Sequence, residues 1–150
     1  MPIGEICTRD VVIVRPKDSI IEAAKLMRSY HVGDVIVVDE QDGQAMLPIG
    51  ILTDRDIVIE LIAQEVSVEN MLVEDVMTDD LMVVKESSGR WDAVQSMRIK
   101  GVRRIVVVND RGALVGIVSS DDLLELISQE LLDLVKAVMR QQDREKESRG

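Results

Sequence analysis

Two copies of one short motif contain the residues that could do chemistry. The motif is Gly-x-x-(Thr/Ser)-x-x-Asp, formed by Gly50, Thr53 and Asp56 in the first copy and by Gly116, Ser119 and Asp122 in the second. A hydroxyl at the start of a helix with an acid three residues later is a capping box. The same geometry suits a phosphate and a ribose, because a helix N-terminus attracts anions and a nearby carboxylate binds a diol. The repetition of the motif at equivalent places favours the ligand site.

Other reactive side chains are few. The chain has one cysteine, Cys7, and one histidine, His31, and the repeat described below places Met77 and Gly101 opposite them. A nucleophile and its base would have to come from these two residues, and no spacing of His, Cys and acids is typical of a metal site. We therefore expect no enzyme and no metal centre.

The elements that position the motifs come from an internal repeat. Residues 22–40 align with 92–110 at an offset of 70, and 50–62 align with 116–128 at an offset of 66. Self-similarity at a fixed period indicates a repeated structural unit. We expect two units, 1–66 and 67–130, and each is small enough to need the other to complete its core.

Each unit is predicted to fold as strand, helix, strand, strand, helix, an α+β pattern. Apolar runs predict strands at 11–14, 35–38, 49–52, 81–84, 105–108 and 115–118, and helical spacing predicts helices at 19–30 and 89–99. Ser19 and Glu22 resemble a capping box; Gly89 replaces Ser19 in the second unit, so Ser88 is the expected cap there. Asp42-Gly43 predicts a turn.

The last helix is predicted to continue past the second motif. Five apolar residues follow a 3,4,3,4 spacing, at Leu124, Ile127, Leu131, Leu134 and Val138. Residues 131–150 are expected to form a helical extension with a solvated tail from Arg140. The seam is either the core face of the second unit's helix or a surface that pairs two chains.

Composition limits the partners. The 150 residues include 28 acids and 18 bases, giving a net charge of −10, and the aromatic residues are Trp91 and Tyr30 with no Phe. Nucleic-acid binding requires a basic face and stacking aromatics, so it is not expected. The longest nearly apolar run, 45–52, is too short to span a bilayer. We expect a cytoplasmic protein without a membrane segment.

The whole pattern resembles a tandem pair of cystathionine-β-synthase (CBS) domains, a Bateman module. The resemblance covers roughly residues 1–130 and rests on HVGDVIVVDE and GVRRIVVVND, followed by GILTDRDI and GIVSSDDL. It implies two βαββα units packed with pseudo-two-fold symmetry, with two clefts between them. Such clefts commonly bind AMP, ADP, ATP or S-adenosylmethionine, and modules often pair into a flat disc, which implies a homodimer.

The resemblance also implies roles for individual residues. Asp56 and Asp122 would hold ribose hydroxyls, and Thr53 and Ser119 the phosphate. Apolar and backbone contacts to adenine would come from Val12, Ile13, His31, Val32 and Gly33 in one site and from Met82, Val83, Gly101, Val102 and Arg103 in the other. The remaining expected ligand-binding positions are Thr8, Thr78 and Ser120.

The two copies differ in charge. Arg103-Arg104 stands where the first copy has Gly33-Asp34, and Arg55 lies beside the first motif. Arginine suits phosphate recognition, so these three arginines are candidate phosphate ligands, although each could also be a solvated surface charge. Because Asp34 would repel a polyphosphate, we expect the two sites to differ in affinity or one to stay empty.

The expected function is therefore that of a stand-alone sensor of adenine nucleotides. Ligand occupancy would change the packing of the two halves and so alter a surface that a protein effector recognises. Two alternatives stay open: a structural or interaction module whose motifs are only helix caps, and a sensor of NAD(H) or S-adenosylmethionine.

Overall fold

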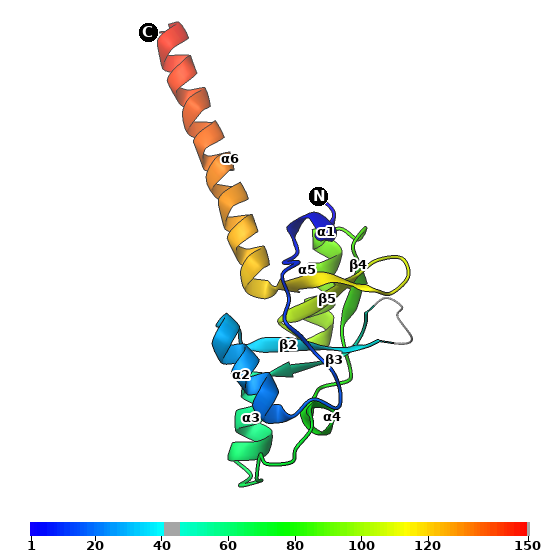
Figure 1. Cartoon of the computed structure of the whole chain (residues 1–150). Coiled ribbons are helices and arrows are strands. Elements are labelled where there is room, and N and C mark those ends of the chain that lie inside the picture. The colour runs from blue at the N-terminus through cyan, green and yellow to red at the C-terminus, as the bar shows by residue number, and fades with distance from the viewer. Residues whose placement is uncertain (41–45, 150) are drawn as a thin grey trace.

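Two three-stranded sheets form the body of the molecule (Figure 1). The computed structural model describes residues 1–40 and 46–149, so the turn predicted at Asp42-Gly43 lies outside the described residues. The first sheet contains β1 (Ile13–Val14), β2 (Asp34–Asp39) and β3 (Leu47–Thr53), and the second contains β4 (Val83–Lys85), β5 (Arg104–Val108) and β6 (Leu114–Ser119). In each sheet the middle strand pairs parallel with the first strand and antiparallel with the last.

The helices of each unit follow its first and third strands, as predicted, which confirms the α+β pattern, and one further short helix that was not predicted precedes the first strand of each unit. The helices are α1 (Ile3–Ile6), α2 (Ile20–Tyr30), α3 (Asp54–Ile57), the π-helical η1 (Val58–Ile62), α4 (Val73–Val76), α5 (Arg90–Lys100) and α6 (Ser120–Arg149). The Ser19 hydroxyl caps α2 by accepting a bond from the Glu22 N–H at 3.1 Å. The cap expected at Ser88 is wrong: Gly89 is the N-cap of α5, and its N–H donates to the Asp92 carboxylate.

The registers of the two sheets correspond residue by residue. Asp34 pairs with Thr53 in the first sheet, and Arg104 pairs with Ser119 in the second. Both antiparallel ladders shift register at the same point, between Val37 and Val38 and between Val107 and Val108. This correspondence agrees with the pseudo-two-fold symmetry that the family resemblance implies.

Small aliphatic side chains fill the space between the sheets. Ile36 and Val38 of β2 are buried against Val106 and Val108 of β5. Residues that are branched at Cβ suit the pleated surface of a sheet. Their size explains how the chain builds a core with almost no aromatic residues.

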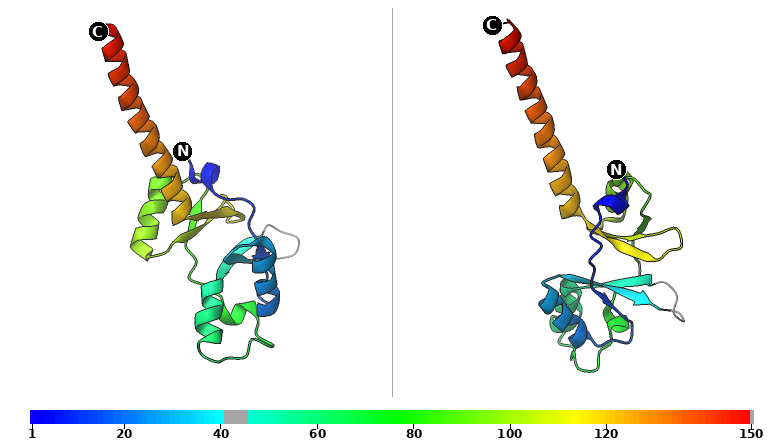
Figure 2. Two further views of the ribbon diagram at one scale, coloured as in Figure 1. Left: turned by 90° about the vertical axis from the view of Figure 1, so that its left-hand side faces the viewer. Right: turned by 45° about the horizontal axis from the view of Figure 1, so that its top comes forward.

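The two units exchange their first segments. Ile3 of α1 is buried with Ala93 and Met97 of α5, while Val73 of α4 is buried in the cluster that holds Ala23. The chain thus begins on the lobe of β4–β6 and then crosses to the lobe of β1–β3 (Figure 2). The unit boundaries 1–66 and 67–130 remain an expectation, and the packing of α1 and α4 crosses them.

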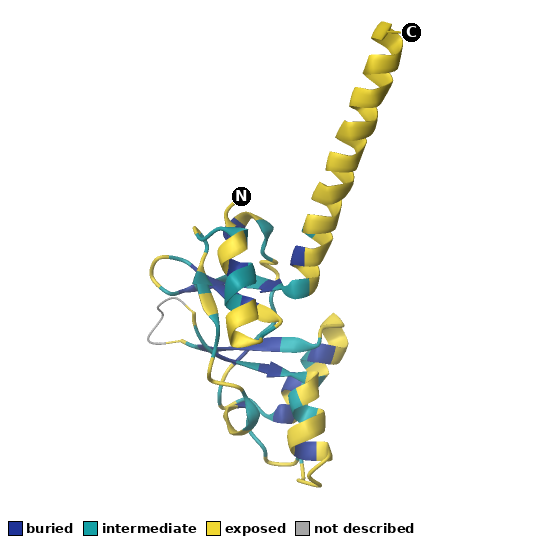
Figure 3. Ribbon diagram, turned by 180° about the vertical axis from the view of Figure 1, so that it is seen from behind, coloured by how far each residue is buried: buried dark blue, intermediate teal, exposed yellow. Residues whose placement is uncertain are grey.

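The 30-residue helix α6 extends away from the body (Figure 3). Leu123 is the only residue of α6 that is buried, and all described residues from Ile127 onward are exposed. The interpretation of the seam as a core face is therefore wrong for this chain on its own, because the helix leaves the body within its first two turns. Among the described residues, no helix is both long enough and apolar enough to cross a membrane.

Candidate functional site

Both motifs form complete capping boxes. The Thr53 N–H donates to Asp56 Oδ2 at 2.9 Å, and the Asp56 N–H donates to Thr53 Oγ1 at 3.1 Å. Ser119 and Asp122 make the same two bonds, at 3.0 Å and 3.1 Å. In these bonds each hydroxyl acts only as an acceptor and each carboxylate uses one oxygen. The hydroxyl proton and the second carboxylate oxygen are left available for a ligand, so the cap and the ligand site are compatible.

The glycine of each motif, Gly50 in β3 and Gly116 in β6, has no side chain, so a segment of the other unit can cross close to that strand. The residue after Gly50, Ile51, exchanges two backbone bonds with Thr78, at 3.0 Å and 2.9 Å, and Ile117 does the same with Thr8, at 2.9 Å and 2.8 Å. A Cβ on Gly50 would lie 2.9 Å from the Thr78 carbonyl oxygen, and one on Gly116 only 2.4 Å from that of Thr8. Thr8 and Thr78 therefore sit beside the motifs through these crossings.

Cleft I is a cavity of about 210 Å³ between the start of the first unit and the second motif. Its lining joins Val12, Val32 and Gly33 to Ser119 and Asp122. The other lining residues are Thr8, Asp10, Val11, Asp34, Arg104 and Ile117. The structure thus combines the adenine segment expected for one site with the hydroxyl and acid of the second motif.

Cleft II is the pseudo-equivalent cavity, of about 240 Å³. Here Met82, Val102 and Arg103 of the second unit meet Thr53 of the first motif. The remaining lining residues are Ile51, Thr78, Asp80, Leu81, Arg104 and Val106. Each cleft is therefore built from both units, a pairing that the linear motif alone does not specify.

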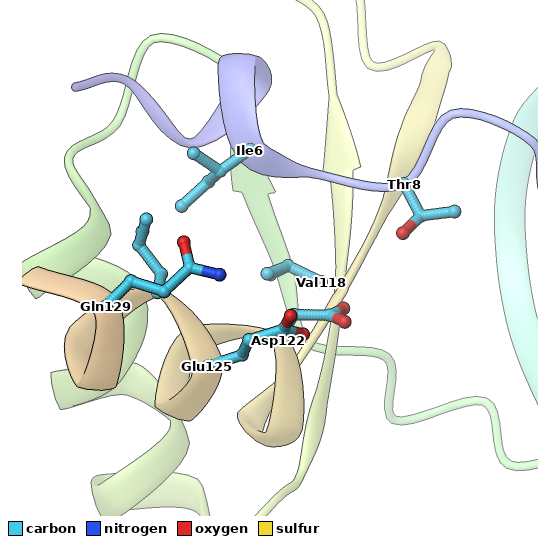
Figure 4. A pocket seen from close by; sticks show the side chains of 7 residues that line it. Ile6, Thr8, Val118, Asp122, Glu125 and Gln129 are labelled. Atoms are coloured by element: carbon cyan, nitrogen blue, oxygen red, sulfur yellow. The ribbon is translucent and has the colours of Figure 1, made fainter.

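Two further cavities adjoin cleft I. One, of about 450 Å³, shares Val12 and Val32 with it and adds Ile13, Leu26 and Tyr30. The other, of about 290 Å³, lies where α6 leaves β6: Asp122 and Glu125 project from the helix beside Val118, with Ile6 and Thr8 opposite (Figure 4). Asp122 lines both this cavity and cleft I, so cleft I continues toward the base of α6.

Several predicted site residues lie outside both clefts. In the described part of the chain these are Arg55, Asp56, Ser120, Ile13, His31, Val83 and Gly101. Asp56 holds Thr53 in place, and Ile13 packs between the sheets. His31 and Gly101 end α2 and α5 in the left-handed conformation, with φ of 55° and 66°. His31 and Gly101 are therefore equivalent in the backbone conformation that ends a helix.

Sequence reasoning did not single out two acids that line the clefts. Asp10 lies in cleft I and Asp80 in cleft II, 70 residues apart, at the offset of the repeat. Their neighbours Val11 and Leu81 line the same clefts. The offset was the available signal, since it pairs these two acids, each two residues after one of the paired threonines Thr8 and Thr78.

The clefts differ in charge. Arg104 Nε lies 2.7 Å from Asp34 Oδ2, and this ion pair borders cleft I. Asp34 is thus neutralised by Arg104, but Asp10 and Asp122 leave cleft I with an excess of acid. Among the described residues that line cleft II, Asp80 is the one acid and Arg103 forms no ion pair. The charge of Arg104 is already paired with Asp34, so cleft II is close to neutral whereas cleft I is acidic. An anion is therefore attracted more strongly to cleft II.

Comparison with known proteins identifies the repeated unit. The model of the CBS domain family matches the chain twice, over residues 3–63 and 73–129. The CBS domain-containing protein YhcV of Bacillus subtilis is 38% identical over 116 residues, which cover 77% of this chain and 78% of that protein. An uncharacterized protein of Methanopyrus kandleri is 36% identical over 124 residues; the match covers 83% of this chain but 61% of that protein, less than two thirds of its length.

Solved structures agree with the fold. A CBS domain protein of Pyrobaculum aerophilum complexed with AMP has a TM-score of 0.72 at 24% identity, covering 85% of this chain and 99% of that one. A CBS domain pair in complex with 5′-methylthioadenosine and S-adenosyl-L-methionine has a TM-score of 0.73 at 24% identity, and the match covers 87% of this chain and 98% of that one. The first family match contains the strands of the first sheet, β1–β3, and the second match contains those of the second sheet, β4–β6. The chain therefore belongs to the CBS domain family, as a tandem pair of CBS domains.

Proposed function

We propose that the chain is a regulatory module that binds adenosine-containing ligands, with AMP, ADP or ATP first among them, in the clefts between its CBS units. One observation carries the proposal: each cleft joins an apolar slot of one unit to the motif hydroxyl of the other. The slot suits adenine, and the hydroxyl suits a phosphate. The ligands in the Pyrobaculum complex and in the 5′-methylthioadenosine and S-adenosyl-L-methionine complex support this ligand class.

Cleft II is the proposed nucleotide site. Arg103 supplies a guanidinium without an acidic partner among the described residues, and Thr53 supplies a hydroxyl proton. Met82 and Val102 would contact the base. Arginine forms bidentate bonds with phosphate, so it contributes both charge and orientation. Asp56 holds Thr53 in place and lies outside the lining of cleft II, and the ribose is proposed to extend beyond that lining to the second carboxylate oxygen of Asp56.

Cleft I is proposed to favour an uncharged or cationic adenosine derivative, because acids exceed bases along its lining. Asp122 would bind the ribose hydroxyls there, and Val12 and Val32 the base. S-adenosylmethionine, whose sulfonium is cationic, belongs to this chemical class, whereas ATP would be repelled. The two sites would then differ in ligand as well as in affinity.

Calorimetric titration with AMP, ADP, ATP, NAD(H) and S-adenosylmethionine tests the proposal. We expect Arg103→Ala to weaken AMP binding by about tenfold, in line with the loss of one charge-assisted bond. Arg55→Ala is the matched control, since Arg55 neighbours the same motif but lies outside cleft II. If none of these ligands binds below millimolar concentration, the proposal is wrong.

A second candidate is an interaction module that binds no nucleotide. The capping boxes favour it, because they are complete without any ligand. Thr53→Ala and Ser119→Ala should each cost about 1 kcal/mol of stability under either function. A melting temperature that rises with AMP, and loses that rise in Arg103→Ala, separates the two candidates in favour of the sensor.

We propose that this sensor acts on a protein effector as a cytoplasmic homodimer, with no catalytic step of its own. Ligand binding would tighten the contact between the units, because both contribute to each cleft. Mass spectrometry of the ligand released on denaturing the purified protein would identify which compound is bound. Recovery of a phospholipid or a metal complex instead would count against the adenosine class.

A further inference from the structure

Helix α6 exposes an apolar face that nothing in the chain covers among the described residues. Its exposed apolar side chains are Leu124, Ile127, Leu131, Leu132, Leu134, Val135, Val138 and Met139, each at least 45% accessible. The helix is held at its base by buried Leu123 and by the ion pair between Arg90 of α5 and Glu130. Beyond that ion pair it extends away from both lobes (Figures 1 and 3).

Such a helix is poorly stabilised in isolation. The 19 residues from Leu131 to Arg149 extend about 28 Å at 1.5 Å per residue. Isolated helices of this length are marginal in water, and most helical stability comes from packing an apolar face. At 100° per residue the eight apolar side chains occupy an arc of about 160°, which is wide enough for a packing surface.

The charges on α6 favour one kind of partner for this face. Residues 120–133 carry five acids and no base, at Asp121, Asp122, Glu125, Glu130 and Asp133. Residues 134–149 carry five bases, Lys136, Arg140, Arg144, Lys146 and Arg149, against three acids. The two ends of the helix thus have opposite charge. A second copy is complementary when the helices run in opposite directions, whereas a parallel pair would place like charges together.

We propose that α6 pairs in antiparallel orientation with α6 of a second copy of this chain. The seam spacing of 3 and 4 residues is that of helices that pack side by side. Leu131 of each helix faces Leu134 of the other, and Ile127 faces Val138. None of these four residues lines either cleft, so the pairing does not rest on nucleotide binding.

Sedimentation equilibrium of the full chain tests the pairing. We expect a dimer of 16.7 kDa chains at micromolar concentration and at least a tenfold weaker dimer in Leu134→Glu. Gln129→Glu is the matched control, because it places the same side chain on the opposite face of the helix and within its acidic half, so it should leave the dimer in place. A monomeric wild-type chain, or a Leu134→Glu variant that dimerises normally, overturns the proposal. AMP affinity measured on the same variants should be unchanged.

Oxidative cross-linking tests the orientation. In the antiparallel pair the two copies of Ser148 lie about 45 Å apart, so Ser148→Cys should not form a disulfide-linked dimer. Leu134→Cys, near the centre of the pair, should cross-link, and the unmodified chain with Cys7 is the background control. Efficient cross-linking through Ser148→Cys would overturn the antiparallel orientation.

Discussion

Asp34 and Arg104 occupy equivalent positions in the two CBS units and are joined by an ion pair of 2.7 Å between Asp34 Oδ2 and Arg104 Nε. Their strand partners are Thr53 and Ser119, the hydroxyl residues of the two motifs. The pair therefore lies between the clefts, and Arg104 lines both of them. A change at one of these residues alters the electrostatics of both ligand sites.

Replacing Asp34 with alanine should release Arg104 toward a bound phosphate. The side chains of Arg104 and Asp34 are 40% and 24% accessible, so the loss of the pair should cost only about 0.2–1 kcal/mol of stability. AMP affinity should rise a few-fold, because removing one acid strengthens the field of Arg104. Calorimetry on Asp34→Ala and Asp34→Asn measures the AMP affinity. Weaker AMP binding in both variants would contradict the prediction and would mean that the ion pair positions Arg104 for the ligand.

Gly116→Ala should destabilise the protein by about 1–3 kcal/mol through overpacking. The new Cβ would lie 2.4 Å from the Thr8 carbonyl oxygen, which is backbone and cannot move away cheaply. Gly50→Ala should cost less, since its closest contact at 2.8 Å is the flexible Met77 side chain, followed by the Thr78 oxygen at 2.9 Å. Urea unfolding of both variants checks this order, and a fully stable Gly116→Ala would show that the crossing segment is loosely packed.

Much of the fold could be predicted because the repeat supplied each element twice. The strands and the longer helices follow from local apolar patterns, and the capping boxes at Thr53 and Ser119 follow from the repeated motif, whereas the short helices α1 and α4 were not predicted. The offset of 70 residues also places Asp34 opposite Arg104, although no local pattern predicts their ion pair. Contacts of this kind depend on how the two units are oriented, which periodicity does not encode.

The composition of each cleft was not predictable for the same reason. Thr53 meets Met82 and Arg103 of the other unit because the segments at Thr8 and Thr78 cross between units. The motif glycine marks these crossings, but a glycine in a strand has several explanations. Arg103 lines cleft II and Arg55 does not. The sequence offers both as candidate phosphate ligands, and only the three-dimensional arrangement distinguishes them.

Alkylation of Cys7 should be slow in the folded protein. Burial raises the pKa of its thiol, an effect that Arg9 opposes and Glu86 reinforces. A raised pKa lowers the fraction of the reactive thiolate at a given pH, so the labelling rate should be lower than that of a free cysteine and should still rise at a pH where the rate of a free cysteine has levelled off. Iodoacetamide labelling followed by mass spectrometry between pH 7 and 10 measures this. Labelling in urea is the control, and equal rates in the two conditions would contradict the prediction.

Replacing His31 with glycine separates a backbone role from a ligand role for this residue. His31 ends α2 with φ of 55° and ψ of 45°, and its counterpart Gly101 ends α5 with φ of 66° and ψ of 36°. A residue with a Cβ is strained in this left-handed region, so His31→Gly should stabilise the protein by about 1 kcal/mol. Gly101→Ala is the reciprocal control and should destabilise it by a similar amount. Thermal unfolding gives the stability change, and calorimetry with AMP and S-adenosylmethionine gives the affinities. Unchanged affinities would assign His31 to the helix terminus alone, whereas a loss of affinity in the stabilised variant would place its imidazole against the adenine.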